Sequence, residues 1–294
     1  MNGFDEKTKY CGLCPKDCRV TRHETYGACG EKNVMRIAKF YPHMFEEPPI
    51  SGKNGSGTIF FTGCSLRCVF CQNYSLSRSE RGKEITPKEL ADIFKKLENA
   101  GVHNINLVTP THFVPEIAEA FSIYRPKIPV VYNTHSYETI KALEIIDPFV
   151  DIYLPDLKFY SPELSLRYTG REDYFEAASN AIKFMMSSKK ANFSEDGMMK
   201  SGVIVRHMIM PLGVSDSKKI LRWFAENRRG GAYISLMAQY TPFGNVDKYP
   251  ELKRPITAGE YERVYEELLN LGITDYFAQE LRSSSESFIP DWDF

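Results

Sequence analysis

Three cysteines in the first quarter of the chain have the spacing of a metal-binding loop. The pattern C-x3-C-x2-C in the run TGCSLRCVFCQN is made by Cys64, Cys68 and Cys71, and an aromatic residue, Phe70, precedes the last of them. Three thiolates can bind three corners of a cubane [4Fe-4S] cluster and leave the fourth iron open to a small molecule, whereas a fully ligated cluster mainly transfers electrons. A closed zinc site would need a fourth ligand nearby. The spacing therefore favours a catalytic cluster over a zinc knuckle or three unrelated thiols.

The other four cysteines form a second group near the amino terminus. The pattern C-x2-C-x3-C-x10-C is made by Cys11, Cys14, Cys18 and Cys29. A total of seven cysteines, clustered at short spacings, indicates metal binding more than a disulfide framework. Four soft ligands are compatible with a zinc ion, with a second iron–sulfur cluster or with no metal. His23 lies between the third and fourth thiols and could replace one of them, although a surface histidine is the simpler interpretation.

The composition of the 294-residue chain is that of a globular protein outside the membrane. Hydrophobic residues make up 43% of it, and the length suits one large α/β domain with an appendage. It has no run of about 18 apolar residues, and the start MNGFDEKTKY lacks the apolar segment of a secretory signal. We therefore expect a cytoplasmic protein that does not enter a membrane. The net charge of -1, from 37 basic and 38 acidic residues, argues against a nucleic-acid partner.

The chain is predicted to divide into a Cys-rich extension with its linker, residues 1–56, and an α/β domain, residues 57–294. The stretch 41–57 is rich in Pro, Gly and Ser, which is typical of a linker. Strands are predicted at 58–63, 104–109, 128–134, 150–157, 202–210 and 232–240. Helices are predicted at 86–101 (Thr86 as N-cap), 114–124, 137–146, 162–168, 173–187, 215–228 (Ser215 as N-cap) and 257–272, and a polar loop at 187–202. This alternation indicates a parallel sheet covered by helices, with its ligand site at the carboxyl ends of the strands.

Polar side chains follow each of the six predicted strands. Because carboxyl ends of parallel strands meet at one edge, we expect these side chains to surround the cysteine loop. About a third of them should instead be structural residues with satisfied hydrogen bonds. The members are Gln72, Asn73, Thr109, Thr111, His112, Asn133, Thr134, His135, Asp156, Lys158, Arg206, His207, Gln239 and Tyr240.

The motifs together resemble the radical S-adenosylmethionine (radical SAM) enzymes, in particular the group related to the pyruvate formate-lyase activating enzyme. The resemblance is carried by YCGLCPKDC, GCSLRCVFCQNYSLS, NINLVTPTHFVPEI, DIYLPDLKFY and VIVRHMIMPLG. It implies a partial (β/α)6 barrel and a [4Fe-4S] cluster on Cys64, Cys68 and Cys71. It further implies reductive cleavage of S-adenosylmethionine to methionine and a 5'-deoxyadenosyl radical that abstracts a hydrogen atom. The expected electron donor is a flavodoxin or a ferredoxin.

The resemblance also suggests which side chains hold the cofactor. S-adenosylmethionine would chelate the open iron, with Arg206 as a partner for its carboxylate. Asn133 and Thr134 suit the ribose hydroxyls, and Phe70 suits the adenine ring. Asp156 and Lys158 could contact the cofactor or the substrate, or form an ion pair with each other. The remaining cofactor-binding candidates are Asn73, Thr109, Thr111 and Gln239.

Two features depart from the pattern of the activating enzymes. Those enzymes usually carry a GGE-type motif after the second strand, whereas TPTH stands at residues 109–112 here. Their additional cysteines tend to follow the cluster motif, whereas the second group precedes it in this chain. The reaction class therefore carries over, but activation of a glycyl-radical enzyme does not follow.

Three functions are compatible with these observations. The first is a radical SAM enzyme that abstracts hydrogen from a protein or peptide, and the second is one that acts on a small molecule or RNA. The third is a non-catalytic metal-binding interaction protein or redox sensor. The polar residues at the strand ends favour catalysis, because an interaction module does not need them around an open iron. A short barrel with a wide lateral opening favours a peptide substrate by analogy of fold.

Overall fold

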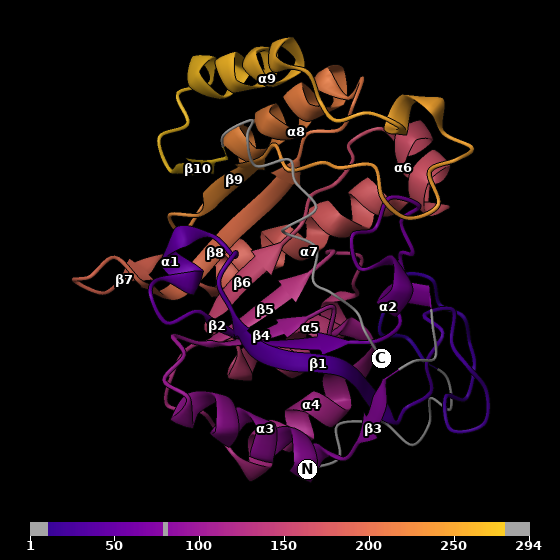
Figure 1. Ribbon diagram of the computed structural model, residues 1–294, viewed down its shortest axis with the longest axis vertical. Coiled ribbons are helices and arrows are strands. Elements are labelled where there is room, and N and C mark those ends of the chain that lie inside the picture. Colours follow the sequence, from indigo (N-terminus) through magenta and orange to yellow (C-terminus); the bar gives the residue numbers. More distant parts are fainter. Residues whose placement is uncertain (1–10, 79–81, 280–294) are drawn as a thin grey trace.

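The computed structural model describes residues 11–78 and 82–279, which contain a ten-stranded sheet with the order β10-β9-β8-β6-β5-β4-β2-β1-β3 and β7 paired to β8 (Figure 1). All six predicted strands are present and parallel. They are β2 (Ser56–Phe61), β4 (Ile105–Val108), β5 (Val130–Thr134), β6 (Ile152–Pro155), β8 (Met199–Met208) and β9 (Tyr233–Met237). The predicted fold class, a partial (β/α)6 barrel with a Cys-rich extension, is confirmed.

Four further strands lie outside the prediction. β1 (Met35–His43) and β3 (Lys83–Ile85) pair antiparallel at one edge of the sheet, and β10 (Tyr276–Ala278) adds a parallel strand at the other. β7 (Asn192–Phe193) forms a hairpin with the start of β8 inside the predicted polar loop. These strands are short or half-exposed, so their residues lack the continuous apolar run that marks a buried parallel strand.

The stretch predicted as a linker, 41–57, is structured. Its first three residues complete β1, in which His43 pairs with Ser56 of β2. Its middle forms a short helix, α1 (Pro48–Ser51), whose Ile50 is fully buried against Val131 and Ile204. The prediction of a linker is therefore wrong, because this stretch completes β1 and packs α1 into the core.

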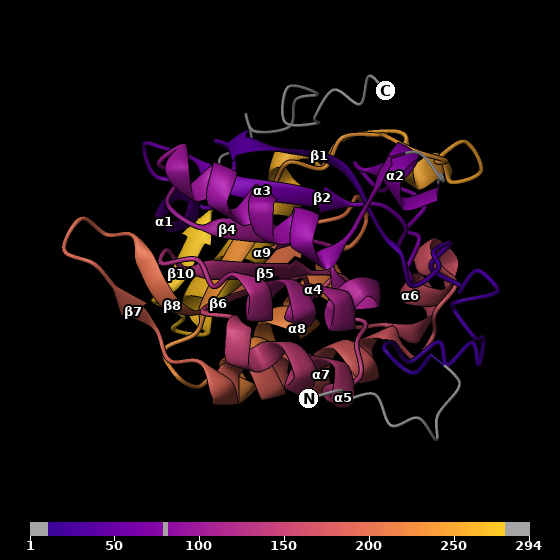
Figure 2. The same ribbon diagram turned by 90° about the horizontal axis from the view of Figure 1, so that it is seen from below.

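The predicted helices are present, and most lie on the outer face of the sheet, where Figure 2 shows α3, α4 and α7. Thr86 begins α3 as predicted and forms a capping box with Glu89. The N-cap of α8 is Gly213 instead of the predicted Ser215. The helices are α2 (Tyr74–Arg78), α3 (Pro87–Asn99), α4 (Val114–Ile123), α5 (Ile140–Ile146), α6 (Pro162–Thr169), α7 (Tyr174–Ser188), α8 (Val214–Asn227) and α9 (Ala258–Asn270). The 3-10 turns are η1 (Thr111–Phe113), η2 (Asp147–Phe149) and η3 (Pro250–Leu252). Among the described residues, no helix has the length and apolar character needed to cross a membrane.

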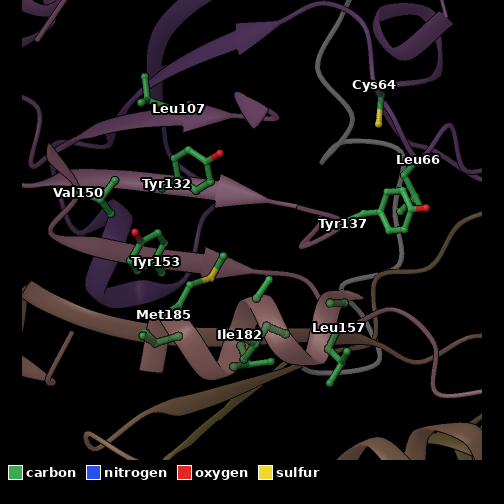
Figure 3. Close-up of a cluster of buried hydrophobic side chains, with 14 of the residues drawn as sticks. Cys64, Leu66, Leu107, Tyr132, Tyr137, Val150, Tyr153, Leu157, Ile182 and Met185 are labelled. Carbon is green, nitrogen blue, oxygen red and sulfur yellow. The ribbon is translucent and has the colours of Figure 1, made fainter. Parts of the chain in front are cut away.

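The main core lies between the sheet and its outer helices (Figure 3). Tyr132 of β5 and Tyr153 of β6 are fully buried near Ile182 and Met185 of α7. The hydroxyl of Tyr132 donates to Glu138 at 2.7 Å, which satisfies its polar atom inside the core. Cys64 lies beyond the carboxyl ends of these strands in Figure 3, so the rigid core supports the loop that carries it.

Candidate active site

A cavity of about 540 Å³ lies inside the curved sheet and reaches the carboxyl ends of its strands. The three thiols of the cysteine loop line it, together with side chains from β1, β2, β4, β5, β8, β9 and β10 and from the residues that follow β6. Nine of the ten other predicted cofactor-binding residues also line it: Phe70, Asn73, Thr109, Asn133, Thr134, Asp156, Lys158, Arg206 and Gln239. These residues therefore line one cavity at the strand ends, and their roles toward a cofactor stay predictions.

The cysteine loop follows β2 and contains positive φ angles, which residues other than glycine rarely adopt. Gly63 has a φ of +75°, and Arg67, between the first two cysteines, has a φ of +52°. The amide of Val69 donates to the carbonyl of Tyr168 at 2.9 Å, which ties the loop to α6. Phe70 is buried and packs edge-on against Tyr168 with ring centroids 6.3 Å apart. The loop therefore presents its thiols from a fixed framework, and strained backbone of this kind is common at functional sites.

The electrostatic surroundings of the three thiols differ. Burial raises the pKa of Cys71 to about 11 and also raises the pKa of Cys68. Burial opposes ionisation of Cys64 as well, but the charge and hydrogen bond of His135 lower its pKa to about 7. Cys64 is therefore the most acidic of the three thiols. Metal ions bind thiolates and displace their protons.

The number of thiols at the cavity suits the predicted cluster. A cubane cluster takes one thiolate on each iron, and a closed zinc site needs four ligands. Cys64, Cys68 and Cys71 line the cavity, and none of the four described amino-terminal cysteines does. Three thiols are therefore available for a [4Fe-4S] cluster with one open iron.

A network of charged side chains crosses the cavity. Arg206 donates to Asp156 at 2.8 Å, to Glu46 at 3.1 Å and to the side-chain oxygen of Asn133 at 2.6 Å. Lys158 donates to the other oxygen of Asp156 at 2.6 Å, so these two residues do form an ion pair. Although burial alone would raise the pKa of Asp156, the charges of Arg206 and Lys158 hold it below its usual value. Asp156 is therefore an anion that orients two cations.

This network changes the expected role of Arg206. Its guanidinium already contacts two carboxylates, so a third carboxylate would have to compete with Asp156 and Glu46. Lys158 uses one of its three N–H donors for Asp156. Lys158 and Cys68 also line the same cavity, which places the ammonium on the side of the cysteine loop. Lys158 is therefore better placed than Arg206 to pair with a carboxylate bound near the cluster.

Two cavity residues escaped the sequence analysis because they lie in the predicted linker. Glu46 accepts hydrogen bonds from Asn106 at 2.9 Å and from Asn133 at 3.1 Å, besides its contact with Arg206. Glu47 is buried, lines the cavity, and has one carboxylate oxygen without a hydrogen-bond partner among the described residues. The acidic pair before two prolines was visible, but no local pattern shows that it enters the barrel.

One predicted cofactor-binding residue, Thr111, does not line the cavity. Thr109 directly follows β4 with a φ of +57°, and this conformation turns the following residues away from the site. Thr111 is fully buried in η1. Its neighbour His112 forms a 2.7 Å hydrogen bond with the carbonyl of Thr62. Both residues are therefore placed as structural parts of the turn.

Two other strand-end residues are also structural. The two ring nitrogens of His207 form 2.8 Å hydrogen bonds with the carbonyl of Leu157 and the hydroxyl of Ser217. The hydroxyl of Tyr240 donates to the carbonyl of Leu252 at 2.7 Å. Neither residue lines the cavity, which agrees with the expectation that part of the strand-end set serves the fold.

The four amino-terminal cysteines lie beside the cysteine loop but outside the cavity. Figures 1 and 2 both show their indigo segment on the side of the molecule where the strands have their carboxyl ends. All four are free thiols; Cys29 is buried and the others are half-buried. The amide of Cys64 donates to the carbonyl of Cys29 at 2.9 Å, so the two cysteine groups are in direct contact.

Comparisons with known proteins agree with this geometry. The family model of the radical SAM superfamily matches residues 58–223. The uncharacterized protein MJ0674 of Methanocaldococcus jannaschii is 30% identical over 267 residues, which cover 88% of this chain and 74% of that protein.

Solved structures of SuiB from Streptococcus suis share the fold. SuiB bound to the precursor peptide SuiA aligns with a TM-score of 0.51 and 13% identity, over 82% of this chain and 48% of SuiB. SuiB bound to S-adenosylmethionine aligns with a TM-score of 0.52 and 14% identity, over 76% and 52%. The chain thus spans about half the length of SuiB. With a family match over more than half of its length and a site of the corresponding fold, the chain belongs to the radical SAM superfamily.

Proposed function

We propose that Cys64, Cys68 and Cys71 hold the [4Fe-4S] cluster at which this radical SAM enzyme reductively cleaves S-adenosylmethionine. The observation that carries this proposal is the single cavity shared by these thiols and nine predicted cofactor-binding residues. When bound and reduced, the cluster supplies the electron that releases the 5'-deoxyadenosyl radical for hydrogen abstraction.

The protein's own residues bind and orient the cofactor in this proposal. Lys158 pairs with the methionine carboxylate, while Asp156 holds Lys158 and Arg206 in place. Asn133 and Thr134 follow β5 and suit the ribose hydroxyls. Phe70 and Gln239 line the same cavity and suit the adenine. Asn73 and Thr109 complete the cofactor-binding set. The buried walls of the cavity exclude water from the radical.

The substrate we propose is a protein or peptide, as in the enzymes that activate glycyl-radical enzymes. Phe45 lines the cavity while 57% of its surface is exposed, and its neighbour Met44 is 46% exposed. Exposed apolar side chains at a cavity rim suit docking of a polypeptide. The peptide-bound structure of SuiB, which shares the fold, supports this choice.

Further partners and location follow from the same proposal. Reduction of the cluster requires an external electron donor, for which a flavodoxin or a ferredoxin is proposed. The proposed location is the cytoplasm, where reducing conditions keep cysteines available for metal. The amino-terminal cysteines are proposed to bind a metal, zinc or a second cluster.

The test is anaerobic cleavage of S-adenosylmethionine. The protein is reconstituted with iron and sulfide, reduced with dithionite and supplied with S-adenosylmethionine, and 5'-deoxyadenosine is measured by mass spectrometry. We expect product from the wild-type protein and none from Cys68→Ala, because two thiolates cannot hold the open cluster. Replacement of the exposed Lys95 by Ala serves as the control and should leave product formation unchanged.

Equal product from Cys68→Ala would refute the cluster assignment. If wild-type protein that holds a full cluster forms no product, the redox-sensor function is favoured instead. The absence of a carboxylate in TPTH, residues 109–112, would then explain why S-adenosylmethionine is not cleaved.

A further inference from the structure

We propose that Glu47 binds a cationic side chain of the substrate inside the cavity, the ammonium of a lysine or the guanidinium of an arginine in the proposed polypeptide. This inference rests on the proposed function and deepens it, because it names the chemical class of residue that the enzyme selects. Glu47 does not belong to the proposed cofactor-binding set, so the inference adds a binding residue for the substrate.

The carboxylate of Glu47 is incompletely satisfied. Glu47 lines the cavity, only 9% of its surface is exposed, and one of its carboxylate oxygens has no hydrogen-bond partner among the described residues. A buried carboxylate that lacks a partner is destabilising, and a paired cation removes that penalty. The terminal torsion of a glutamate side chain is soft, so either oxygen can turn towards a ligand. Glu47 is therefore suited to accept hydrogen bonds from a group that enters the cavity.

The charges of the cavity wall leave Glu47 without a cation of its own. In the described part of the chain, three carboxylates line the cavity, those of Glu46, Glu47 and Asp156, against one lysine and one arginine, Lys158 and Arg206. Each guanidinium nitrogen of Arg206 already donates to another side chain, and Lys158 pairs with Asp156. Burial raises the pKa of Glu47, and the attraction of Arg206 offsets this rise only in part. A cation from the substrate supplies the charge that the wall lacks.

Glu47 reaches the cavity from the end opposite to the cysteine loop. β1 runs antiparallel to β2, and its last residue, His43, pairs with Ser56 at the start of β2. The cysteine loop instead follows the carboxyl end of β2. In the proposed function S-adenosylmethionine chelates an iron at that loop, so its own ammonium belongs to the loop. The carboxylate of Glu47 therefore remains for the substrate.

The wall beside Glu47 suits an aliphatic stem. Met208 of β8 and Met237 of β9 pair with each other and line the cavity. They lie two residues beyond Arg206 and Ser235, on the same face of each strand and nearer its carboxyl end. Lysine and arginine carry their charge at the end of an apolar stem, and methionine side chains adapt readily to such a stem. An apolar wall with an acid beyond it therefore selects a basic side chain.

The experiment compares the binding of blocked pentapeptides that differ only in their central residue. This residue is lysine, arginine, norleucine (an aliphatic stem without charge) or glutamate, and alanine occupies the other positions. The full chain is reconstituted anaerobically, and the Kd of each peptide is measured by calorimetry without reductant, with and without S-adenosylmethionine. We expect the lysine and arginine peptides to bind with a Kd about ten- to hundredfold lower than that of the norleucine peptide, as a charge-assisted hydrogen bond implies. The glutamate peptide should bind most weakly.

Replacement of Glu47 by Gln keeps the size of the side chain and removes its charge. In Glu47→Gln we expect the Kd values of the lysine and norleucine peptides to become equal. Glu144→Gln is the matched control, because Glu144 is exposed on α5 outside the cavity, and this variant should keep the preference for lysine. Circular dichroism checks that both variants are folded. Should Glu47→Gln fail to fold, the comparison of the peptides in wild-type protein still decides.

Three results would overturn the proposal. The first is wild-type protein that binds the lysine peptide no better than the norleucine peptide, or binds neither. The second is a folded Glu47→Gln variant that keeps the preference for lysine. The third is a preference that disappears when S-adenosylmethionine is bound, which would assign Glu47 to the ammonium of the cofactor. Failure of the proposed function looks different, because the peptide preference is then present while dithionite-reduced protein forms no 5'-deoxyadenosine.

Discussion

At the scale of single residues, the site is organised by one carboxylate. Asp156 accepts hydrogen bonds from both Arg206 and Lys158 and holds them on the cavity wall. The two terminal nitrogens of Arg206 donate to Glu46 and Asn133, so its guanidinium mainly connects neighbouring segments of the cavity wall. Lys158 keeps donors available and lines the same cavity as the cysteine loop. We therefore expect the two cations to differ in what they do for the cofactor.

Replacement of Lys158 by Met should weaken S-adenosylmethionine binding without loss of iron. A charge-assisted hydrogen bond contributes about 1.5–3 kcal/mol, which corresponds to roughly a ten- to hundredfold higher Kd. Binding is measured by anaerobic calorimetry on reconstituted protein, with iron content as a check. Replacement of Lys95, which lies outside the cavity, by Met is the matched control. An unchanged Kd for the Lys158 variant would assign the carboxylate to another residue.

At the scale of secondary-structure elements, one side chain, Glu260, fixes the first turn of α9 and its position on the barrel. The Glu260 carboxylate accepts hydrogen bonds from Arg254 at 2.7 and 2.8 Å, from the amide of Thr257 at 2.8 Å and from the amide of Leu212 at 2.8 Å. Hydrogen bonds from Arg254, assisted by those of the two amides, lower the pKa of Glu260 to about 2. One side chain thus caps α9 and ties it to the loop after β8.

Substitution of Glu260 by Gln should lower the free energy of unfolding in a pH-dependent way. Because the folded pKa is about 2 and the usual value is 4.5, the stabilisation is fully present above pH 4.5 and is lost as the pH falls towards 2. At pH 7 we expect a loss of about 1–2 kcal/mol, since the partly exposed Arg254 is screened by solvent. Urea unfolding of the metal-free protein at pH 7 and pH 3 should show a smaller difference from wild type at pH 3. Replacement of Glu262, exposed on the same helix, by Gln is the control, and an equal loss at both pH values would contradict the assignment.

At the scale of the whole molecule, the Cys-rich segment is fastened to the barrel at several points. Arg22 donates to the carbonyls of His112 and Lys32, and its guanidinium lies 5.5 Å from the ring centroid of Phe113. The hydroxyl of Thr139 donates to the carbonyl of Gly12 at 3.0 Å. The segment therefore covers the carboxyl-end face of the sheet and belongs to the same compact body as the active site.

Loss of Arg22 should release this segment. In Arg22→Ala we expect chymotrypsin to cleave within residues 11–34 about tenfold faster than in wild type, because hydrogen bonds of a buried cation contribute about 1.5–3 kcal/mol to docking. Cleavage is followed by mass spectrometry under anaerobic conditions. Arg19→Ala is the matched control, since Arg19 lies in the same segment with 78% of its side chain exposed. Equal cleavage rates in the two variants would mean that Arg22 does not anchor the segment.

Local patterns in the sequence determined the chemistry and the main architecture. The spacing of Cys64, Cys68 and Cys71 is a property of one loop, so no tertiary information is needed to recognise it. The parallel strands are buried on both faces, so their apolar runs can be recognised in the sequence. Thr86 and Glu89 mark the start of α3, because their contacts lie within one turn of the helix.

Only the tertiary structure decided which polar residues form the site. Glu46 and Arg206 are 160 residues apart and meet because the predicted linker folds into the barrel. His135 reaches the Cys64 thiol from another strand, while Thr111 turns away after the left-handed Thr109. Such contacts depend on how strands lie side by side and on single backbone angles, and neither quantity is encoded in spacing along the chain.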